Sequence, residues 1–413
     1  MSIYEFERNN DREALSEALL TADNAAVRRQ AAKALGELDG DNENQARGTQ
    51  RMFNALRTAV IEDPDESVRT TAVKALEQHG TGELRRVIST LTEQPIDSID
   101  QRTYASLATD ERPEIRMLSM AAIGQGSDLG SADIVLNALD DPDHRVRERA
   151  IAATTKLGLG RAESALIKAL EDEVPAVRSA AATAIGDLNL KTASDALASK
   201  TSDDNESVRL AALDALATLG SPAAIEPLAE AMQSHSDAMN RHAIYGLLEL
   251  LTNVSGSDSH ELREQVKSVV KGAPRTTVID TLVELLDDMK KAPQRRNAVW
   301  LLSQLIEDRT TDDAVVALTD LIGDDDEQTS KLATSALIRG DARVVERIVR
   351  QRLSEVDPND TEAGQLAYVL GRVGSDRSIE SLEQTLDDTD DDSIRKQVVS
   401  ALNRLDSGGE VYG

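Results

Sequence analysis

Apolar and small residues recur along the chain at positions that predict a series of amphipathic helices. In the copy that begins at Val177, alanine follows four residues later at Ala181, and isoleucine eight residues later at Ile185. Residues at this spacing lie on one face of an α-helix. Successive copies are 31 residues apart, as the positions of their arginines show: Arg147, Arg178 and Arg209. The pattern therefore predicts a repeat built from helices.

Each predicted helix is preceded by an acidic turn and followed by a second, more polar helix. The clearest turn is Asp140-Asp141-Pro142-Asp143, and aspartate is a favoured N-cap because it accepts hydrogen bonds from free helix N–H groups. Glycine near the end of the first helix, such as Gly186, predicts a left-handed C-cap. We expect second helices at, for example, 162–171 and 223–233. Helix pairs at this period predict an all-α fold, a right-handed α-solenoid of about ten repeats.

The consensus of these copies, D-x-x-x-x-V-R-x-x-A-x-x-A-L-G, resembles HEAT repeats, in particular the short subclass that is similar to phycobilisome lyases. The resemblance is strong over 12–36, 63–79, 110–250 and 390–405, and weaker over 294–389. It implies a HEAT-like solenoid with four parts. These are an N-terminal repeat block at 1–250, an irregular insertion with one extra helix (276–289) at 251–293, degenerate HEAT-like repeats at 294–405 and a flexible tail at 406–413.

An arginine and an aspartate recur in nearly every copy of the repeat. A catalytic residue would not be needed so many times in one chain. We therefore predict a structural ladder, in which each arginine hydrogen-bonds the aspartate turn of a neighbouring repeat. For Arg178, that turn is the one at Asp172 or the one at Asp203. The predicted members of the ladder are Arg28, Arg69, Arg116, Arg147, Arg178, Arg209, Arg395, Asp63, Asp140, Asp172 and Asp203.

The composition excludes several classes of protein. Aromatic residues make up 2% of the 413 residues, whereas large β-sheets depend on aromatic and β-branched side chains. The chain has no cysteine, which excludes disulfides, thiolate metal sites and thiol nucleophiles. No stretch approaches about 18 uninterrupted apolar residues, and the N-terminus does not resemble a signal peptide. We expect a cytoplasmic protein.

The charge balance is strongly acidic. The chain has 74 Asp and Glu against 46 Lys and Arg, with only 12 lysines, and a net charge of −28. Together with the lack of cysteine, this composition resembles the proteins of salt-in halophilic archaea. In molar salt the Debye length is about 3 Å, so recognition must depend on apolar contact and short polar pairs.

The sequence contains no motif that predicts a catalytic, cofactor or metal site. None of the five histidines forms an H-x-x-x-H pair, and His260-Glu261 is a single His-Glu pair. The HEAT-like enzyme deoxyhypusine hydroxylase binds two irons through several such pairs, so one pair is too few. No nucleotide-binding glycine loop occurs. We expect neither cofactor nor small-molecule substrate.

Three departures from the repeat are candidate binding regions: 39–50, 94–112 and 251–294. Insertions in a solenoid map to one face, which is often the binding face. Trp300 and Tyr245 are the large aromatic residues of the repeat-bearing helices. Either could anchor an interface, but their apolar-face spacing favours burial of both.

A non-enzymatic scaffold that binds other proteins along its surface is the function that these features favour. The resemblance to short HEAT-like proteins of halophiles suggests a signalling or taxis pathway. One alternative is an assembly factor for a chromophore or cofactor, related to bilin lyases. The other is a nucleic-acid-binding HEAT-like protein, which the charge of −28 opposes. Two basic clusters depart from this acidity, one formed by Lys290-Lys291 with Arg295-Arg296 and the other at 343–352.

Overall fold

The computed structural model describes residues 3–38, 46–233, 237–254, 258–307 and 309–406. Within these residues the chain is helical and contains no strand, and it folds as a solenoid of HEAT-like helix pairs. It divides into two compact units, Met1–Ala215 and Leu216–Gly413. The all-α solenoid that the repeat predicts is confirmed.

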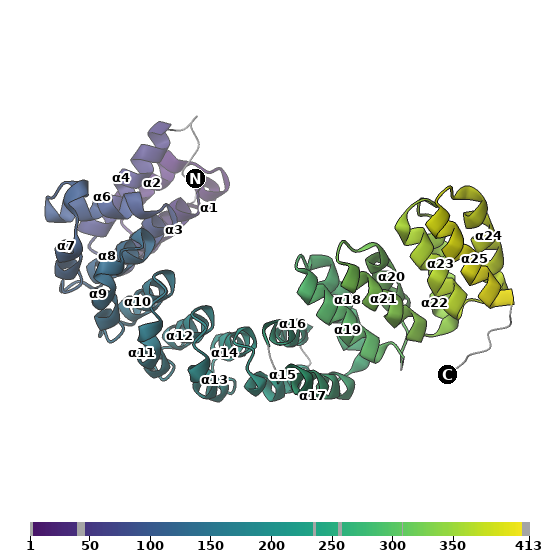
Figure 1. The fold of residues 1–413 in the computed structure, drawn as a ribbon. Helices are drawn as coiled ribbons and strands as arrows, with labels where there is room; N and C mark the ends of the chain where they lie inside the picture. The colour runs from purple at the N-terminus through teal and green to yellow at the C-terminus, as the bar shows by residue number, and fades with distance from the viewer. Residues whose placement is uncertain (1–2, 39–45, 234–236, 255–257, 308, 407–413) are drawn as a thin grey trace. The chain divides into compact units, whose positions relative to one another are not determined.

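The first unit contains α1 to α13 and most of α14, with short 3₁₀ turns between several of them (Figure 1). Its α-helices are α1 (Ile3–Arg8), α2 (Arg12–Thr21), α3 (Ala25–Glu37), α4 (Ala46–Glu62), α5 (Glu66–Gln78), α6 (Thr81–Thr92), α7 (Gln101–Leu107), α8 (Pro113–Gly126), α9 (Ala132–Ala138), α10 (His144–Lys156), α11 (Glu163–Ala169), α12 (Pro175–Asp187), α13 (Ser194–Lys200) and α14 (Glu206–Thr218).

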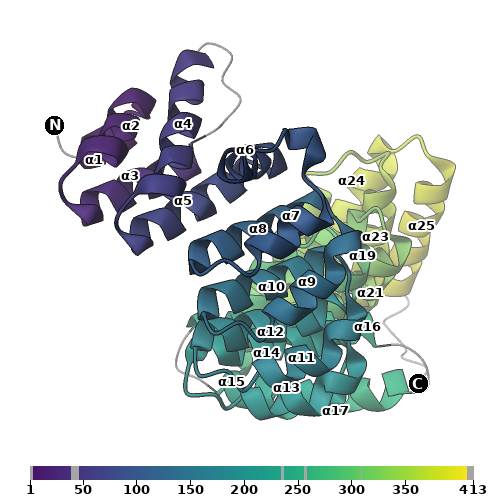
Figure 2. The same ribbon diagram turned by 90° about the vertical axis from the view of Figure 1, so that its left-hand side faces the viewer.

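Helices of the first unit pack in two rows. The helices that begin with the Val-Arg pattern stack in order, α3 on α5, α5 on α8, α8 on α10 and α10 on α12. The shorter helices pack behind them, with α2 against α3, α9 against α10 and α11 against α12. Figure 2 shows these successive pairs side by side. The row of Val-Arg helices brings each acidic turn next to the following one.

The second unit continues the same scheme. Its helices are α15 (Ile225–Ala231), α16 (Asp237–Asn253), α17 (Asp258–Gly272), α18 (Arg275–Asp288), α19 (Ala292–Leu305), α20 (Asp312–Asp320), α21 (Glu327–Arg339), α22 (Ala342–Leu353), α23 (Thr361–Val373), α24 (Ile379–Asp388) and α25 (Asp392–Asp406). Helix α16 packs on α19, followed by α21, α23 and α25, while α18, α20, α22 and α24 form the second row.

Alanine and glycine set the spacing between stacked helices. Ala181 and Ile185 of α12 are fully buried. A Cβ on Gly186 would lie 3.0 Å from the Cα of Ala215 in α14, so the glycine permits close helix approach. The predicted left-handed cap is therefore wrong for Gly186. The left-handed residue comes three positions later, at Asn189, whereas Gly158 and Gly220 do have positive φ.

Two irregular segments of the sequence are more helical than predicted. The segment 94–112 contains a 3₁₀ turn, Ile96–Ser98, and helix α7. The segment 251–293 contains two helices, α17 and α18, rather than one extra helix. Helix α18 pairs with α19, and α17 packs against both α15 and α19. In the third segment, 39–45 lies outside the described residues and 46–50 begins α4. Residues 255–257 and the predicted tail from 407 onward also lie outside them.

The two aromatic residues have different environments. Tyr245 of α16 is 43% exposed, so the prediction that it is buried is wrong. The buried apolar face of α16 is formed by Ala243, Ile244 and the leucines at 247, 248, 250 and 251, so Tyr245 lies outside it. Trp300 is half-buried, and the guanidinium of Arg263 lies over its ring at 5.1 Å from the centroid.

Candidate functional site

The recurring arginine forms two sets of hydrogen bonds, as Arg147 of α10 illustrates. Its Nη1 donates to the carbonyl oxygens of Asp141 and Pro142 in its own turn, at 2.9 and 3.2 Å. Its Nε and Nη2 donate to the two carboxylate oxygens of Asp172 in the next turn, at 2.7 and 2.8 Å. Such a bidentate pair fixes geometry as well as charge. One side chain thus joins two consecutive turns.

The aspartate of each pair also shapes its own turn. The Oδ1 of Asp172 accepts the backbone N–H of Val174 at 2.9 Å, two residues later, immediately before α12 begins. Asp203 accepts the N–H of Asn205 in the same way at 2.9 Å. The carboxylate therefore holds the turn in the shape that starts the helix and presents its remaining lone pairs to the arginine.

The same bidentate contact recurs in both units. The pairs are Arg28 with Asp63, Arg116 with Asp141, Arg147 with Asp172, Arg178 with Asp203, and Arg295 with Asp324. The last pair was not among the predicted members. The signal for it in the sequence was the Asp-Asp-Asp run at 324–326, which follows Arg295 as the other acidic turns follow their arginines.

Three predicted members lack the arginine–carboxylate pair among the described residues. Asp140 pairs with Lys168 on the exposed surface at 2.6 Å, and its neighbour Asp141 has the ladder position instead. The reason is register, because the aspartate must precede its own arginine by six residues, and Asp141 precedes Arg147 by that distance. Arg209 and Arg395 donate only to backbone carbonyls among the described residues.

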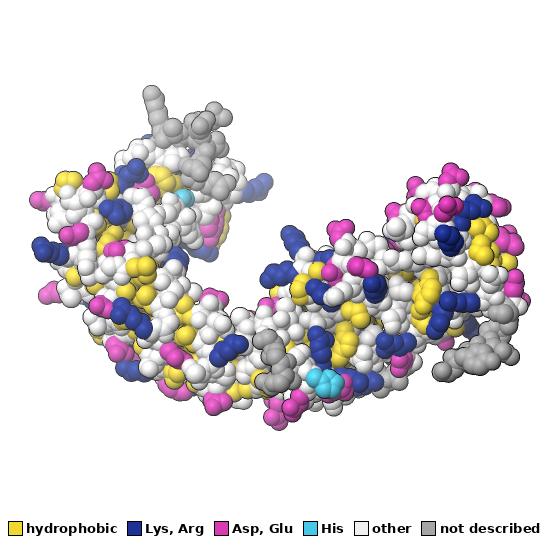
Figure 3. Space-filling model, in the orientation of Figure 1, with side chains coloured by type: hydrophobic (Ala, Val, Ile, Leu, Met, Phe, Trp, Pro, Cys, Tyr) yellow, Lys and Arg dark blue, Asp and Glu magenta, His cyan; other side chains and the backbone are white. Residues whose placement is uncertain are grey.

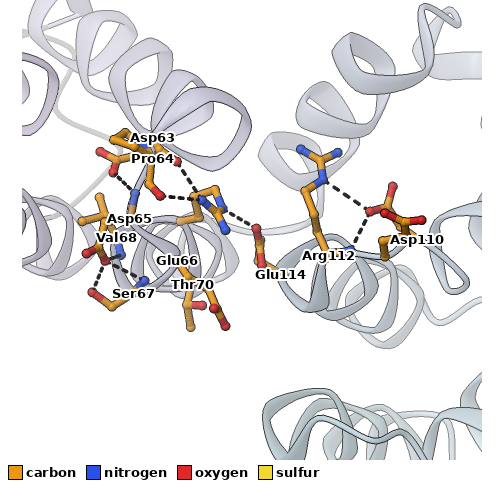
Figure 4. Close-up of polar contacts among 12 residues, drawn as sticks. Asp63, Pro64, Asp65, Glu66, Ser67, Val68, Thr70, Asp110, Arg112 and Glu114 are labelled. Atoms are coloured by element: carbon orange, nitrogen blue, oxygen red, sulfur yellow. Dashed lines mark hydrogen bonds and ion pairs between the residues drawn. The ribbon is translucent and has the colours of Figure 1, made fainter.

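The ladder changes partner between α5 and α8. Arg69 donates its Nε to the fully buried Glu114 of α8, while its Nη1 donates to the carbonyl oxygens of Asp63 and Pro64. Figure 4 shows Glu114 facing the turn that contains Asp63 and Pro64. Asp110, the aspartate expected at this step, accepts from the backbone and side chain of Arg112 instead. The segment that contains α7 separates the two turns here and alters the register.

Hydrogen bonding stabilises the ionised forms of these pairs. Burial of Asp172 opposes ionisation, but the hydrogen bonds from Arg147 and the Val174 N–H outweigh it, so the pKa of the Asp172 carboxyl lies below its usual value. For Asp203, the hydrogen bond from Arg178 is the largest cause of its lowered pKa. In these two pairs the hydrogen bonds to arginine thus favour the charged form of the aspartate.

A second contact joins helices that are not neighbours in the row. Arg145 of α10 reaches past α8 and donates to the Thr70 hydroxyl at 2.9 Å and to Glu66, both on α5. The same guanidinium, bonded to Asp143, lowers the pKa of that carboxyl to about 2. These contacts fix the spacing of three successive helices in the first unit.

Two grooves lie on the surface of the separate units. In the first unit, a groove of about 720 Å³ between α10 and α12 is lined largely by small residues such as Ala152, Ala176 and Ala180. In the second unit, a groove of about 1090 Å³ lies along α22 and is lined by Arg343, Arg347, Arg350 and Arg377. Figure 3 shows Lys and Arg side chains gathered over the helices of the second unit.

In the basic cluster at 290–296, both arginines have carboxylate partners, whereas Lys290 and Lys291 are exposed. Arg295 is bound by Asp324, and Arg296 lies 3.3 Å from a carboxylate oxygen of Asp326. The part of the chain that the structure describes has no group of three His, Asp or Glu side chains placed to hold a metal ion. None of its helices combines the length and hydropathy that a membrane crossing requires.

The match to a family model agrees with this architecture. The family model for HEAT repeats matches residues 12–105 and 162–249. Among solved structures, the chain is similar to an engineered protein at 19% identity, with a TM-score of 0.43 over 97% of this chain and 100% of that one. It is also similar to the complex of CpcE and CpcF of phycocyanin lyase from a Nostoc species, at 19% identity and a TM-score of 0.38 over 62% of this chain and 94% of that one.

A much closer relative covers almost the whole chain. A HEAT repeat-containing taxis protein of Halobacterium salinarum is 38% identical over 408 residues, which is 98% of each chain. Identity at this level over the full length includes the degenerate repeats as well as the regular ones. The chain therefore belongs to the family of HEAT repeat proteins that includes this Halobacterium taxis protein.

Proposed function

We propose that this protein is a non-enzymatic scaffold that binds other proteins in a taxis pathway. The observation that carries the proposal is the 38% identity to a HEAT repeat-containing taxis protein across 98% of both chains. HEAT solenoids present long surfaces on which a partner segment or domain can lie. The arrangement of charged groups in this chain supports a binding role rather than a chemical one.

The use of the recurring polar residues supports this role. A catalytic group must reach a substrate, whereas the ladder arginines donate to their own turn and to the next one. Their function in the proposal is to hold the repeats at a fixed spacing. In this proposal, exposed side chains on the outer surfaces of the helices bind the partner.

The proposal extends to the host and compartment. The net charge of −28 and the scarcity of lysine agree with a halophilic cytoplasm, and the close relative comes from Halobacterium salinarum. We therefore place this scaffold in the cytoplasm of a halophile, where its partners are bound in molar salt.

Deletion of the gene in the native host tests the proposal. Cells without the protein are expected to grow and swim normally but to lose their bias in a light or chemical gradient, measured by tracking single cells. Re-expression of the wild-type chain should restore the bias. A deletion strain that responds to gradients as the parent does would refute a role in taxis.

A further inference from the structure

The groove along α22 is unusual in this acidic chain. Residues 339–352 contain five of the 34 arginines, and three of them, Arg343, Arg347 and Arg350, line one side of the groove. Arg377 lines it from the 3₁₀ turn Asp376–Ser378, which precedes α24. The helix positions 343, 347 and 350 share one face, because they are four and three residues apart.

Hydrogen bonds join the two walls at the base of the groove. Glu346 of α22 is 8% exposed and accepts the backbone N–H of Ser375 at 2.8 Å and the hydroxyl of Ser378 at 2.7 Å. Arg350 lies 3.3 Å from the hydroxyl of Ser381 on α24. These contacts link α22 to α24 and to the turn before it, and they fix the width of the groove. The single carboxylate that lines the groove is therefore occupied by internal donors.

Several of the arginines lack a carboxylate partner. Among the described residues, the structure gives the guanidinium groups of Arg343 and Arg377 no ion pair, and both side chains are exposed. Arg347 pairs with Asp312 at 2.6 Å, but both side chains are more than half exposed, and such pairs exchange readily with other carboxylates. Five ladder arginines, in contrast, each have a bidentate carboxylate partner, namely Arg28, Arg116, Arg147, Arg178 and Arg295.

We propose that this groove binds an acidic segment of a partner protein, with carboxylates paired to Arg343, Arg347, Arg350 and Arg377. The proposal rests on the scaffold function and names the partner's chemistry at one site. Charge complementarity carries it, because four arginines face one internally bonded glutamate. Arginine is the side chain best suited to bidentate recognition of carboxylates, and such short contacts persist when salt screens long-range attraction.

The spacing of the arginines fits a protein segment. Arg343 and Arg347 are about 6 Å apart along the helix axis, given a rise of about 1.5 Å per residue. Side chains on one face of an extended segment repeat every two residues, at about 6.6 Å. Acidic residues at alternate positions of a short segment would therefore meet successive arginines.

A nucleic acid fits the surroundings less well. The exposed carboxylates Asp341, Glu355 and Asp376 are close in sequence to the residues that line the groove and would repel a long chain of phosphates. The net charge of −28 opposes the approach of a long polyanion. A segment of about four residues, about 10 Å from its first to its last residue, would match the distance of about 10.5 Å between Arg343 and Arg350 along α22.

A binding assay with the full chain tests the inference directly. The probe is a fluorescein-labelled octapeptide of alternating glutamate and alanine, and the matched probe has glutamine in place of glutamate. Fluorescence anisotropy is measured at the lowest salt at which circular dichroism shows the native helix content. The glutamate peptide should bind at least about tenfold more tightly than the glutamine peptide.

Two double variants distinguish binding in the groove from an effect of the protein's net charge. R343Q/R377Q removes two exposed charges from the groove and should weaken binding of the glutamate peptide on the order of tenfold. R29Q/R102Q makes the same change in net charge at exposed arginines of the first unit, and should leave affinity within about twofold. Equal loss in the two variants, or equal binding of the two peptides, would overturn the inference. Tighter, groove-dependent binding of octathymidylate would overturn it in favour of a nucleic-acid site.

The same variants distinguish failure of this inference from failure of the scaffold function. Each is expressed in the deletion strain, and the taxis response is measured. We expect R29Q/R102Q to restore the response and R343Q/R377Q to fail, with equal amounts of folded protein. If the deletion strain is defective and both variants restore it, the groove is not used and the taxis role stands. If the deletion strain has no defect, the taxis role itself is wrong.

Discussion

Removing one ladder arginine should loosen its own repeats by an amount that depends on whether it has a carboxylate partner. Arg147→Ala deletes the bidentate pair with Asp172 and the bonds to the Asp141 and Pro142 carbonyls. The side chains of Arg147 and Asp172 are only 12% and 10% exposed. The variant therefore leaves a nearly buried carboxylate without its counter-charge.

The magnitude follows from these contacts. A hydrogen bond to a charged group contributes about 1.5–3 kcal/mol, and breaking a buried ion pair costs about 3–5 kcal/mol. Asp172 keeps the Val174 N–H and some contact with water, so we expect a loss of about 3 kcal/mol, at the lower end of that range. Arg209 occupies the same position in its repeat but bonds only two carbonyls among the described residues. Arg209→Ala should cost about 1 kcal/mol.

Hydrogen exchange measured by mass spectrometry is the suitable assay, because the stability of a solenoid is a sum of repeat and nearest-neighbour terms. In Arg147→Ala, amides of α10 and α12 should exchange about 100-fold faster than in the wild type, as about 1.4 kcal/mol corresponds to a factor of ten. Arg209→Ala should raise exchange in α14 only about fivefold. Amides of α19 to α25 should be unchanged in both.

The comparison between the two variants can refute the reasoning. If Arg147→Ala and Arg209→Ala had equal effects, the carboxylate pair would contribute nothing beyond the carbonyl bonds. If the faster exchange of Arg147→Ala spread evenly over the chain, the ladder would not act between neighbouring turns. Loss of partner binding with wild-type exchange rates would show that Arg147 contacts a partner.

Three further predictions concern pH, packing and salt. The pKa of Asp172 is lowered in the folded chain, so its ion pair stabilises the fold above the usual aspartate pKa. This stabilisation is lost as the pH falls through the lowered pKa. The difference in unfolding free energy between wild type and Arg147→Ala, measured by urea titration, should therefore shrink between about pH 5 and pH 3. A Cβ on Gly371 would lie 2.7 Å from the Cα of Ala401, so Gly371→Ala should destabilise the α23–α25 contact by about 1–3 kcal/mol. As a control, a Cβ on Gly82 would meet no atom within 4 Å, so Gly82→Ala should be neutral or stabilising in thermal melts. With 74 acidic against 46 basic residues, the melting temperature should rise between 0.1 M and 3 M KCl by at least about 10 °C, and equal values would contradict the halophilic interpretation.

The sequence was sufficient for the fold and for most of the ladder because both follow from short, repeated patterns. Val177, Ala181 and Ile185 mark a helix face by spacing alone, and the structure buries all three. The partner of Arg116 required more, because Asp140 and Asp141 both belong to the turn. Asp141 lies six residues before Arg147, and its carboxylate accepts the backbone N–H of Asp143 within the same turn. This position distinguishes it from Asp140.

Other features depend on contacts between segments that the pattern does not encode. Arg69 bonds Glu114 rather than Asp110, because the segment with α7 lies between the two turns. The pattern did not predict α17, whose apolar face packs against helices of two different pairs. Likewise, Tyr245 is exposed because its neighbours Ala243 and Ile244 and the leucines of α16 fill the core. These outcomes depend on tertiary packing, which spacing within one helix cannot determine.

The contrast between two kinds of arginine links the fold to the proposed function. Arg147 and Arg343 both lie in the first turns of helices that follow an acidic residue. The sequence distinguishes them by the Val-Arg pattern, which Arg147 carries and Arg343 lacks. Arg147 has a carboxylate at 2.7 Å and two carbonyls in its own turn, so a partner protein could reach it only by breaking those bonds. Arg343 lies on the open side of a groove whose carboxylate is bonded to serines. Because a guanidinium has five donors and remains charged, the partners that it already has decide whether it stabilises a repeat or is free to bind. On that basis, substitutions in the ladder should change stability first and binding second, whereas substitutions in the α22 groove should change binding with little effect on stability.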